Sequence, residues 1–272
     1  MVKSLKDEFR RDTGRVEAGD KPRYFSCVSW FMEYQRLRSG DVGNCVVAMD
    51  VFSFNLAGQA ADSYIQEKKA GPLTSAVRVM EEQVRHLFLL VSGGDDALRT
   101  VGLGLMQRVY WDAEPRDRCL KVAQVWRPGA FTRKHLESVM GLVHGTVKVL
   151  DYCRRRYLPE VPSFYDESGG RRRPKLTNTQ KLKLAAANYS VDWYVGRLLS
   201  SGAIKMYACA LRNFLTNSEE VNHYIATFMT RVCKLKINAK RVDFSKEGEE
   251  PESDAGEEVR RWGRWGRMPG EP

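Results

Sequence analysis

Residues 72–94 read PLTSAVRVMEEQVRHLFLLVSGG, and this stretch decides the fold class. Apolar residues recur in it at every third or fourth position, which is the period of one face of an α-helix. Pro72 suits the first turn of a helix, and the pair Gly93-Gly94 ends one. The stretch therefore predicts a long amphipathic helix whose apolar stripe is Leu73, Val77, Met80, Val84, Leu87 and Val91.

The same period appears on both sides of this helix. The further predicted helices cover residues 22–38, 97–111, 115–126, 132–150, 201–214 and 219–236. Asn217 followed three residues later by Glu220 resembles a capping box, so we expect Asn217 to cap the last of them. No stretch alternates between apolar and polar residues as a strand bounded by hairpin turns does. The sequence therefore predicts an all-α fold.

The arrangement of these helices follows from their apolar stripes, each of which must be covered. Short turns marked by Gly or Pro favour antiparallel helix pairs. Such pairs can stack into an α-solenoid or close into a compact bundle. No repeat of about 40–47 residues is visible, so the repeats of a solenoid would be degenerate. We expect an α-solenoid of degenerate HEAT/armadillo-like helix pairs.

The domain organisation is predicted from composition. Residues 1–162 form a first helical block and residues 189–239 a second. Between them, residues 163–188 run from SFYDESGG through RRRPK into a polar stretch, which is typical of a flexible basic insertion. Residues 240–272 are acidic, then end in RRWGRWGRMPGEP without a helical period. We expect this tail to be disordered.

Composition excludes two classes of protein. The longest uninterrupted run of hydrophobic residues has six residues, whereas a membrane helix needs about 20. Charged residues follow Met1 directly, so no secretory signal is expected. We therefore expect an intracellular chain that does not bind a membrane.

The positive charge is unevenly spread. The chain carries a formal charge of +10, and residues 148–183 alone account for +6. A concentrated excess of this kind indicates a polyanionic partner. The basic residues that we expect to contact nucleic acid are Arg154, Arg155, Arg156, Arg171, Arg172, Arg173, Lys175, Lys181 and Lys183.

These basic clusters also fit roles that involve no nucleic acid. Cations at a helix C-terminus interact favourably with the helix dipole, and this alone could account for Arg154, Arg155 and Arg156. The cluster at residues 171–175 fits phosphate contact, but it equally fits a nuclear import signal, and simple solubility is a third possibility.

Catalytic and cofactor motifs are not apparent. The sequence contains no GxGxxG, GxxxxGK[ST], GxSxG or HExxH motif. His135 and His144 would lie on opposite flanks of one helix, which is a poor arrangement for a metal. The adjacent pairs Glu81-Glu82 and Asp95-Asp96 cannot face each other on a helix, so we expect helix-start and solvent-facing charges there. We expect no enzyme, no cofactor, no metal and no small-molecule substrate.

The remaining notable side chains are thiols and aromatic rings. Six scattered cysteines show no zinc or disulfide spacing, so we expect buried, reduced thiols. Aromatic residues are dense, and we expect most of them in a helix–helix core, the alternative being a groove that grips a partner helix. They are Tyr24, Phe25, Trp30, Phe31, Tyr34, Trp126, Tyr207, Phe214, Tyr224 and Phe228.

Three segments resemble one family. Residues 23–36 (RYFSCVSWFMEYQR) resemble the aromatic helix ending in a polar-Arg pair that marks the Timeless proteins, which are replication fork protection subunits. Residues 131–155 (FTRKHLESVMGLVHGTVKVLDYCRR) resemble the next long helix of that family. Residues 211–224 (LRNFLTNSEEVNHY) are similar to its LRN-aromatic-xx-NS-xxx-NH turn, and a charged insertion between the last two segments is also typical.

The resemblance implies a function as well as a fold. Timeless proteins are non-enzymatic α-solenoids that pair with the Timeless-interacting protein (Tipin), accompany the replicative helicase and grip parental duplex DNA in the nucleus. They support fork stability, fork pausing and checkpoint signalling. Family members are far longer, so the resemblance implies a truncated member. The matching turn residues expected to bind the partner are Arg212, Asn213, Asn217, Asn222 and His223.

Two alternatives to this function remain. One is a generic α-solenoid for protein–protein interaction without a nucleic-acid role, in which the basic insertion serves nuclear import only. The other is a helical enzyme whose catalytic groups come together from distant positions.

Overall fold

The computed structural model describes residues 2–11, 17, 19–38, 42–110, 113–157, 191–199 and 201–244. Within these residues the chain is helical and contains no β-strand, which confirms the all-α prediction. The elements are α1 (Val2–Arg11), α2 (Asp20–Arg38), η1 (Gly43–Ala48), α3 (Val51–Gln66), α4 (Ala70–Ser92), α5 (Asp96–Leu105), η2 (Met106–Tyr110), α6 (Ala113–Val125), α7 (Arg133–Tyr157), α9 (Val191–Arg197), α10 (Ser201–Arg212) and α11 (Glu219–Phe244).

The ends of several helices follow the predicted signals. Pro72 lies in the first turn of α4, and Gly93 follows its last residue. Asp95 caps α5, because its carboxylate accepts hydrogen bonds from the backbone N–H groups of Ala97 and Leu98 at 2.8 and 3.0 Å. The hydroxyl of Thr132 accepts a hydrogen bond from the N–H of His135 at the start of α7. Short polar side chains thus satisfy backbone donors that a helix start leaves without partners.

Three predictions about the helices need correction. Ser218, and not Asn217, accepts a hydrogen bond from the N–H of Val221 at the start of α11. This helix extends to Phe244, beyond the expected block end at residue 239. The sequence patterns also predict no helix at α3, whose buried face consists largely of small residues such as Ala57, Gly58 and Ala61. The predicted insertion at 163–188 and the tail beyond 244 lie outside the described residues.

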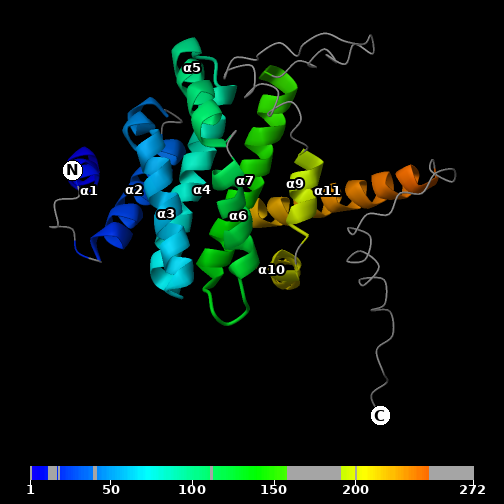
Figure 1. Ribbon diagram of the computed structural model, residues 1–272. Helices are drawn as coiled ribbons and strands as arrows, with labels where there is room; N and C mark the ends of the chain where they lie inside the picture. The colour runs from blue at the N-terminus through cyan, green and yellow to red at the C-terminus, as the bar shows by residue number, and fades with distance from the viewer. Residues whose placement is uncertain are drawn as a thin grey trace, which may run out of the picture. The chain divides into compact units, whose positions relative to one another are not determined.

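Helix α4 lies at the centre of the packing. It contacts α2, α3, α5 and α7, with α2 and α3 to its left and α7 to its right in Figure 1. Being surrounded, it buries residues around most of its circumference, including Ala76, Val79, Val84, Leu87 and Leu90. A helix contacted on all sides belongs to the core and not to the surface of a domain.

Helices that are not consecutive in sequence form two rows. In the first row α2 contacts α4 and α4 contacts α7, and in the second α3 contacts α6 and α6 contacts α10. The rows are joined where α3 packs on α4 and α6 packs on α7. The described helices therefore lie in two adjoining layers.

Glycines permit the close approach of α4 and α7. A Cβ atom added to Gly145 of α7 would lie 2.8 Å from a methyl carbon of Val84, and one added to Gly141 would lie 2.8 Å from Cδ of Glu81. Both distances are shorter than van der Waals contact. Larger residues at these two positions would therefore push the helices apart.

The cysteines depart in part from expectation. Cys45, Cys119 and Cys153 are buried, whereas Cys27 and Cys209 are half-buried and Cys233 is exposed. The prediction of buried thiols is therefore confirmed for three of the six and wrong for Cys233.

The chain divides into two units. Residues Met1–Val232 form one compact unit and Cys233–Pro272 a second, and all contacts of the candidate site described below lie within the first. No described helix combines the length and hydropathy needed to cross a bilayer.

Candidate functional site

A cluster of charged side chains joins α2, α4 and α11. Arg36 of α2 donates two hydrogen bonds to Glu82 of α4, from Nε at 3.0 Å and from Nη2 at 2.9 Å. Arg85 of α4 bonds Oε1 of Glu81 at 2.6 Å and forms an ion pair of 2.8 Å with Glu220 of α11. It also donates to the hydroxyl of Tyr224 at 2.8 Å. We call Arg36, Glu81, Glu82, Arg85, Glu220 and Tyr224 the α4 charge cluster.

The α4 charge cluster corrects the prediction that Glu81 and Glu82 are solvent-facing. Their residues are only 8 % and 6 % exposed, because α2, α7 and α11 cover this part of α4. Burial raises the pKa of the Glu81 carboxyl to about 7, outweighing the attraction of Arg85. Burial also tends to raise the pKa of Glu220, but the Tyr224 hydroxyl and the charge of Arg85 outweigh it, so that pKa is lowered. The cluster positions helices against one another.

The turn between α10 and α11 is held by its own asparagines. The amide of Asn217 donates to the carbonyl oxygen of Ala210 at 2.8 Å and to Oδ1 of Asn222 at 3.2 Å. Asn222 in turn donates to the carbonyl of Phe214 at 2.9 Å, and Asn213 donates to that of Cys209 at 3.3 Å. These three predicted partner-binding residues are therefore engaged within the turn, where they fix its shape.

The other two predicted partner-binding residues lie on the surface. Arg212 is exposed at the end of α10. His223 is exposed on α11, and its ring centroid lies 5.1 Å from that of His144 on α7. Two apolar side chains of the turn are also exposed, Leu215 to 95 % and Phe214 to 49 %. The asparagines of the motif thus fix the turn, whereas Arg212, Phe214, Leu215 and His223 are exposed on its surface.

Three of the predicted nucleic-acid-binding arginines lie at the C-terminal end of α7. Arg154, Arg155 and Arg156 are exposed, and Arg155 forms an ion pair of 3.0 Å with Asp151. Arg231 of α11 approaches the same carboxylate at 3.1 Å, which brings a further cation to this end of α7. The geometry fits a surface that meets phosphate groups, and it also fits favourable interaction with the helix dipole.

The remaining predicted basic residues lie outside the described residues. They are Arg171, Arg172, Arg173, Lys175, Lys181 and Lys183.

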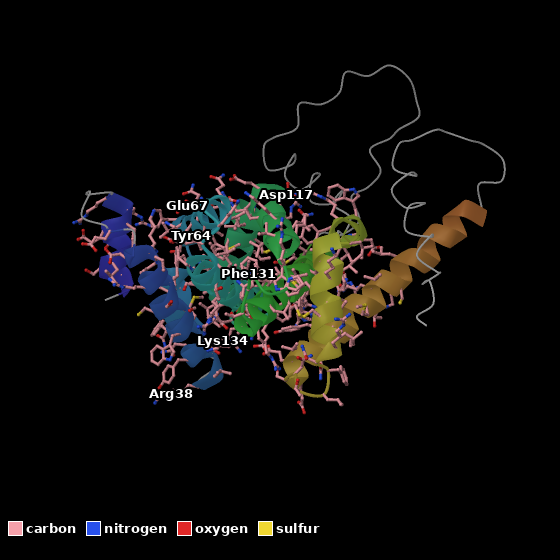
Figure 2. All side chains as sticks on the ribbon, turned by 90° about the horizontal axis from the view of Figure 1, so that it is seen from below. Arg38, Tyr64, Glu67, Asp117, Phe131 and Lys134 are labelled. Atoms are coloured by element: carbon pink, nitrogen blue, oxygen red, sulfur yellow. The ribbon has the colours of Figure 1, made fainter. Side chains whose placement is uncertain are left out.

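The aromatic residues of α2 divide between core and surface. Tyr24 and Phe25 are buried, as predicted, and Phe31 is half-buried. Trp30 is 61 % exposed, and its ring stacks on that of Tyr34 at 5.4 Å between centroids. Arg38 donates to the Tyr34 hydroxyl at 2.5 Å and lies at the edge of the molecule (Figure 2). One side of α2 thus packs in the core while the other presents aromatic rings to solvent.

The other aromatic predictions are mostly confirmed. Trp126, Tyr207, Tyr224 and Phe228 are buried, and the rings of Tyr207 and Phe228 stack at 3.8 Å. Phe214 is the exception, because it lies on the turn and not beneath it.

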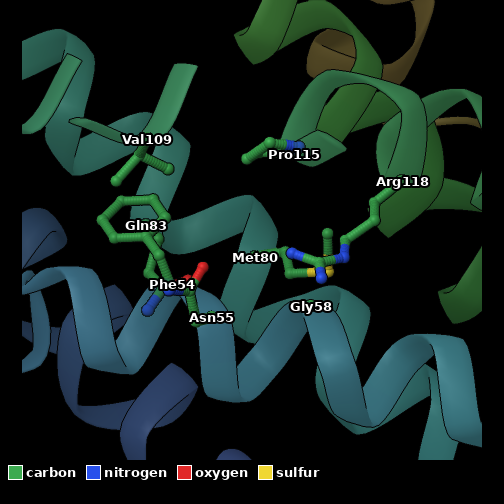
Figure 3. A pocket seen from close by; sticks show the side chains of 8 residues that line it. All are labelled: Phe54, Asn55, Gly58, Met80, Gln83, Val109, Pro115 and Arg118. Atoms are coloured by element: carbon green, nitrogen blue, oxygen red, sulfur yellow. The ribbon is translucent and has the colours of Figure 1, made fainter. Parts of the chain in front are cut away.

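A small cavity lies between α3, α4, η2 and α6 (Figure 3). Its volume of about 20 Å³ has room for a water molecule and not for a metabolite. Arg118 reaches it by crossing Gly58, and pairs there with Asp62 of α3 at 2.9 Å and with Glu114. Over the part of the chain that the structure describes, no three His, Cys, Asp or Glu side chains gather closely enough to hold a metal ion.

Comparison with known proteins adds no assignment. No protein-family model matches the sequence, and no similar curated protein was found.

Proposed function

We propose that this protein is a non-enzymatic scaffold of the Timeless type within a replication fork protection complex. It binds a Tipin-type partner and duplex DNA in the nucleus, works beside the replicative helicase, and supports fork stability, fork pausing and checkpoint signalling. Its helices form an α-solenoid of degenerate HEAT/armadillo-like pairs, a fold that offers a long surface for partners.

One observation carries the proposal: the three segments that resemble Timeless proteins come together around α4. Arg36 ends the first segment and binds Glu82. Tyr224 ends the third segment and binds Arg85, one turn further along the same helix.

The second segment joins them along α7. Arg133, near its start, donates to the carbonyl oxygen of Thr216 in the turn of the third segment at 2.7 Å. The ring of His144, further along α7, lies 4.6 Å from that of Tyr224. Segments from distant parts of the sequence therefore share one packing site, as motifs of a single structural unit do.

The two rows of helices support the solenoid. In stacked helix pairs, each helix contacts its pair mate and the corresponding helix of the next pair. The sequence of contacts from α2 through α4 to α7, with α3 through α6 to α10 alongside, has this form.

The DNA-binding part of the proposal rests on exposed positive charge. Lysine and arginine contacts to phosphate give a sequence-independent grip, which suits a protein that moves with a fork. The described contribution comes from the end of α7, where Arg154, Arg155 and Arg156 meet solvent. The basic run at residues 171–175 follows these arginines in the sequence and adds further positive charge.

The partner part is tested by mixing the purified full chain with the purified Tipin-type protein encoded by the same genome. Size-exclusion chromatography with light scattering should show a stoichiometric complex. Separate elution at micromolar concentrations of both proteins would contradict the proposed partner and leave the generic interaction module as the better description.

The DNA part is tested by filter binding of a duplex across a salt series. Arg154→Ala with Arg156→Ala, and separately Ala at Arg171, Arg172, Arg173 and Lys175, should each flatten the plot of log K against log salt. The slope should change by about 0.9 for each phosphate group that the variant no longer neutralises. Lys21→Ala with Arg23→Ala on α2 is the matched control and should leave the slope unchanged. Equal slopes in all variants would remove these clusters from DNA binding.

A further inference from the structure

An exposed apolar ridge runs along α10 into the turn that follows it. Ile204, Ala208 and Leu211 are spaced by three or four residues, which places them on one face of the helix, and Leu215 lies in the turn just after the helix ends at Arg212. Ile204 is 38 % exposed, Leu211 47 % and Leu215 95 %, and Ala208 between them is also exposed. We call Ile204, Ala208, Leu211 and Leu215 the α10 ridge.

The opposite face of α10 is fully used in the core. Ala203, Met206, Tyr207 and Ala210 are buried, and α10 packs against α6 and α7 with this face. The exposure of the ridge therefore follows from how the helix is anchored. Three apolar side chains on one helix face, with a fourth in the turn that follows, are more than the scattered apolar residues of an ordinary surface.

The ridge is held in a fixed shape at its most exposed end. Leu215 lies in the turn that Asn217 and Asn222 tie to the carbonyl oxygens of Ala210 and Phe214. Arg133 of α7 adds a hydrogen bond to the carbonyl of Thr216 at 2.7 Å. A nearly fully exposed leucine on a backbone fixed from three directions is pre-organised for contact, so binding would cost little ordering entropy.

The charged side chains of α10 itself and of the turn after it have a single sign. Residues 201–218 contain no Asp or Glu, and their two charged side chains are Lys205 and Arg212. Both are exposed and, being seven positions apart, lie on the same flank of α10. A partner that covers the ridge must therefore bring carboxylates to that flank if its charges are to be complementary.

The exposed stripe of α2 lacks this bias. This stripe consists of Trp30, Tyr34 and Leu37. Along it, Arg23 pairs with Asp20 on the same helix, and Glu33 pairs with Arg78 of α4. Acidic as well as basic side chains lie along this stripe, so it does not favour a partner of one charge.

We propose that the α10 ridge is a docking site for an amphipathic helix of another protein, with aliphatic side chains along one face and carboxylates along the edge that meets Lys205 and Arg212. Apolar residues of the incoming helix would pack between Ile204, Leu211 and Leu215, in the helix-to-groove manner common among peptide-binding proteins. The inference concerns the surface and the chemistry of its partner, and it does not depend on the partner being of the Tipin type.

The test uses two fluorescein-labelled peptides of about 21 residues, or about six helical turns. Both carry the same leucine stripe at positions a and d of a heptad, flanked in one by glutamates and in the other by lysines. Fluorescence anisotropy with the full chain should give a dissociation constant at least about tenfold lower for the glutamate peptide, a difference of about 1.4 kcal/mol.

Two sets of variants assign the binding to the ridge. Leu211→Ser with Leu215→Ser should raise the dissociation constant of the glutamate peptide at least about tenfold. Lys205→Glu with Arg212→Glu should reverse the preference, so that the lysine peptide binds more tightly. All four side chains are exposed, so circular dichroism should show unchanged helix content and thermal midpoint.

The matched controls lie on α2. Leu37 is a leucine exposed to 71 %, and Leu37→Ser should leave peptide binding unchanged. Lys21→Glu with Arg23→Glu should leave the preference for glutamate unchanged. Absence of measurable binding by the glutamate peptide, equal affinities of the two peptides, or equal losses in the ridge and control variants would each overturn the proposal. The peptide test does not use the Tipin-type protein. Failure of that protein to bind the chain would therefore be a separate result, which does not bear on this proposal.

Discussion

The guanidinium of Arg36 on α2 and the carboxylate of Glu82 on α4 face each other in a two-point ion pair, with N–O distances of 3.0 and 2.9 Å. Glu82 is almost fully buried and Arg36 largely so. A pair of this geometry fixes both the spacing and the rotation of two helices. It lies beside Arg85, which connects the same stretch of α4 to α11. Three helices from distant parts of the sequence are thus held at one point.

Removal of Arg36 should strongly destabilise the fold. Arg36→Ala leaves the Glu82 carboxylate buried without its two-point partner, and the free energy of unfolding should fall by about 3 kcal/mol. Urea unfolding followed by circular dichroism measures this change. Arg155→Ala is the control, because Arg155 pairs with Asp151 on the exposed surface of α7 and should cost less than about 1 kcal/mol. Equal losses in the two variants would show that the Arg36 pair does not fasten α2 to α4.

A methyl group on Gly141 should destabilise the fold although alanine favours helices. The added Cβ would lie 2.8 Å from Cδ of Glu81 and closer still to one of its oxygens. The buried carboxylate would have to move off Arg85, and overpacking of this kind costs about 1–3 kcal/mol. Gly104→Ala on α5 is the matched control, since its Cβ would meet nothing within 4 Å. That control should gain about 0.5–1 kcal/mol in a urea titration, so the two substitutions should differ in sign.

Glu81 should make stability fall as the pH rises through the range below neutrality. Burial raises the pKa of its carboxyl to about 7 in the folded state, against 4.5 for an ordinary glutamate. The folded state therefore holds the proton more tightly, and stability is lost between pH 4.5 and about 7. Glu81→Gln mimics the protonated form, so its stability relative to the wild type should increase over this range.

The comparison with Glu81→Gln is necessary because buried histidines act in the opposite direction. Burial lowers the pKa of His135 and that of His144 to about 4, so each stabilises the fold as the pH rises toward 6.5. These contributions are common to the wild type and the variant and cancel in the difference. Unfolding free energies of both proteins at several pH values test the prediction, and a difference that stays constant with pH would refute it.

Asn217 should matter for stability and Arg212 should not. Asn217→Ala removes the hydrogen bond to the carbonyl of Ala210, and a loss of about 1–2 kcal/mol is expected on thermal or urea unfolding. Arg212→Ala alters an exposed side chain and should change stability by less than about 0.5 kcal/mol. A neutral Asn217→Ala would mean that the turn keeps its shape by other contacts.

Much of the helical structure follows from patterns local to each helix. The stripe from Leu73 to Val91 and its flanking Pro72 and Gly93 locate α4 to within a few residues. Helix α3 is not predicted in this way, because Ala57, Gly58, Ala60 and Ala61 form much of its buried face. Small side chains produce little contrast in hydrophobicity, so a period read from large apolar residues passes over them.

The α4 charge cluster is not predicted for a different reason. Neighbours on a helix point about 100° apart, so one of Glu81 and Glu82 would ordinarily face solvent. Both are buried because Arg36 approaches from α2 and Gly141 of α7 leaves room for Glu81. Within residues 72–94, the one indication that this part of α4 is covered is that Val79 and Leu90 extend the apolar surface beyond a single stripe.

The contacts of Arg85 indicate how two fragments of the chain would behave if it were cut between its two helical blocks. Arg85 and Asp151 precede residues 158–190 in the sequence, and their partners Glu220 and Arg231 follow them. The two ion pairs therefore join the parts of the chain on either side of this interval. If the polypeptide were cleaved there, the two fragments would present complementary charges and apolar faces to each other. Two separately expressed fragments should therefore recombine into a one-to-one complex, and their helix content should rise on mixing.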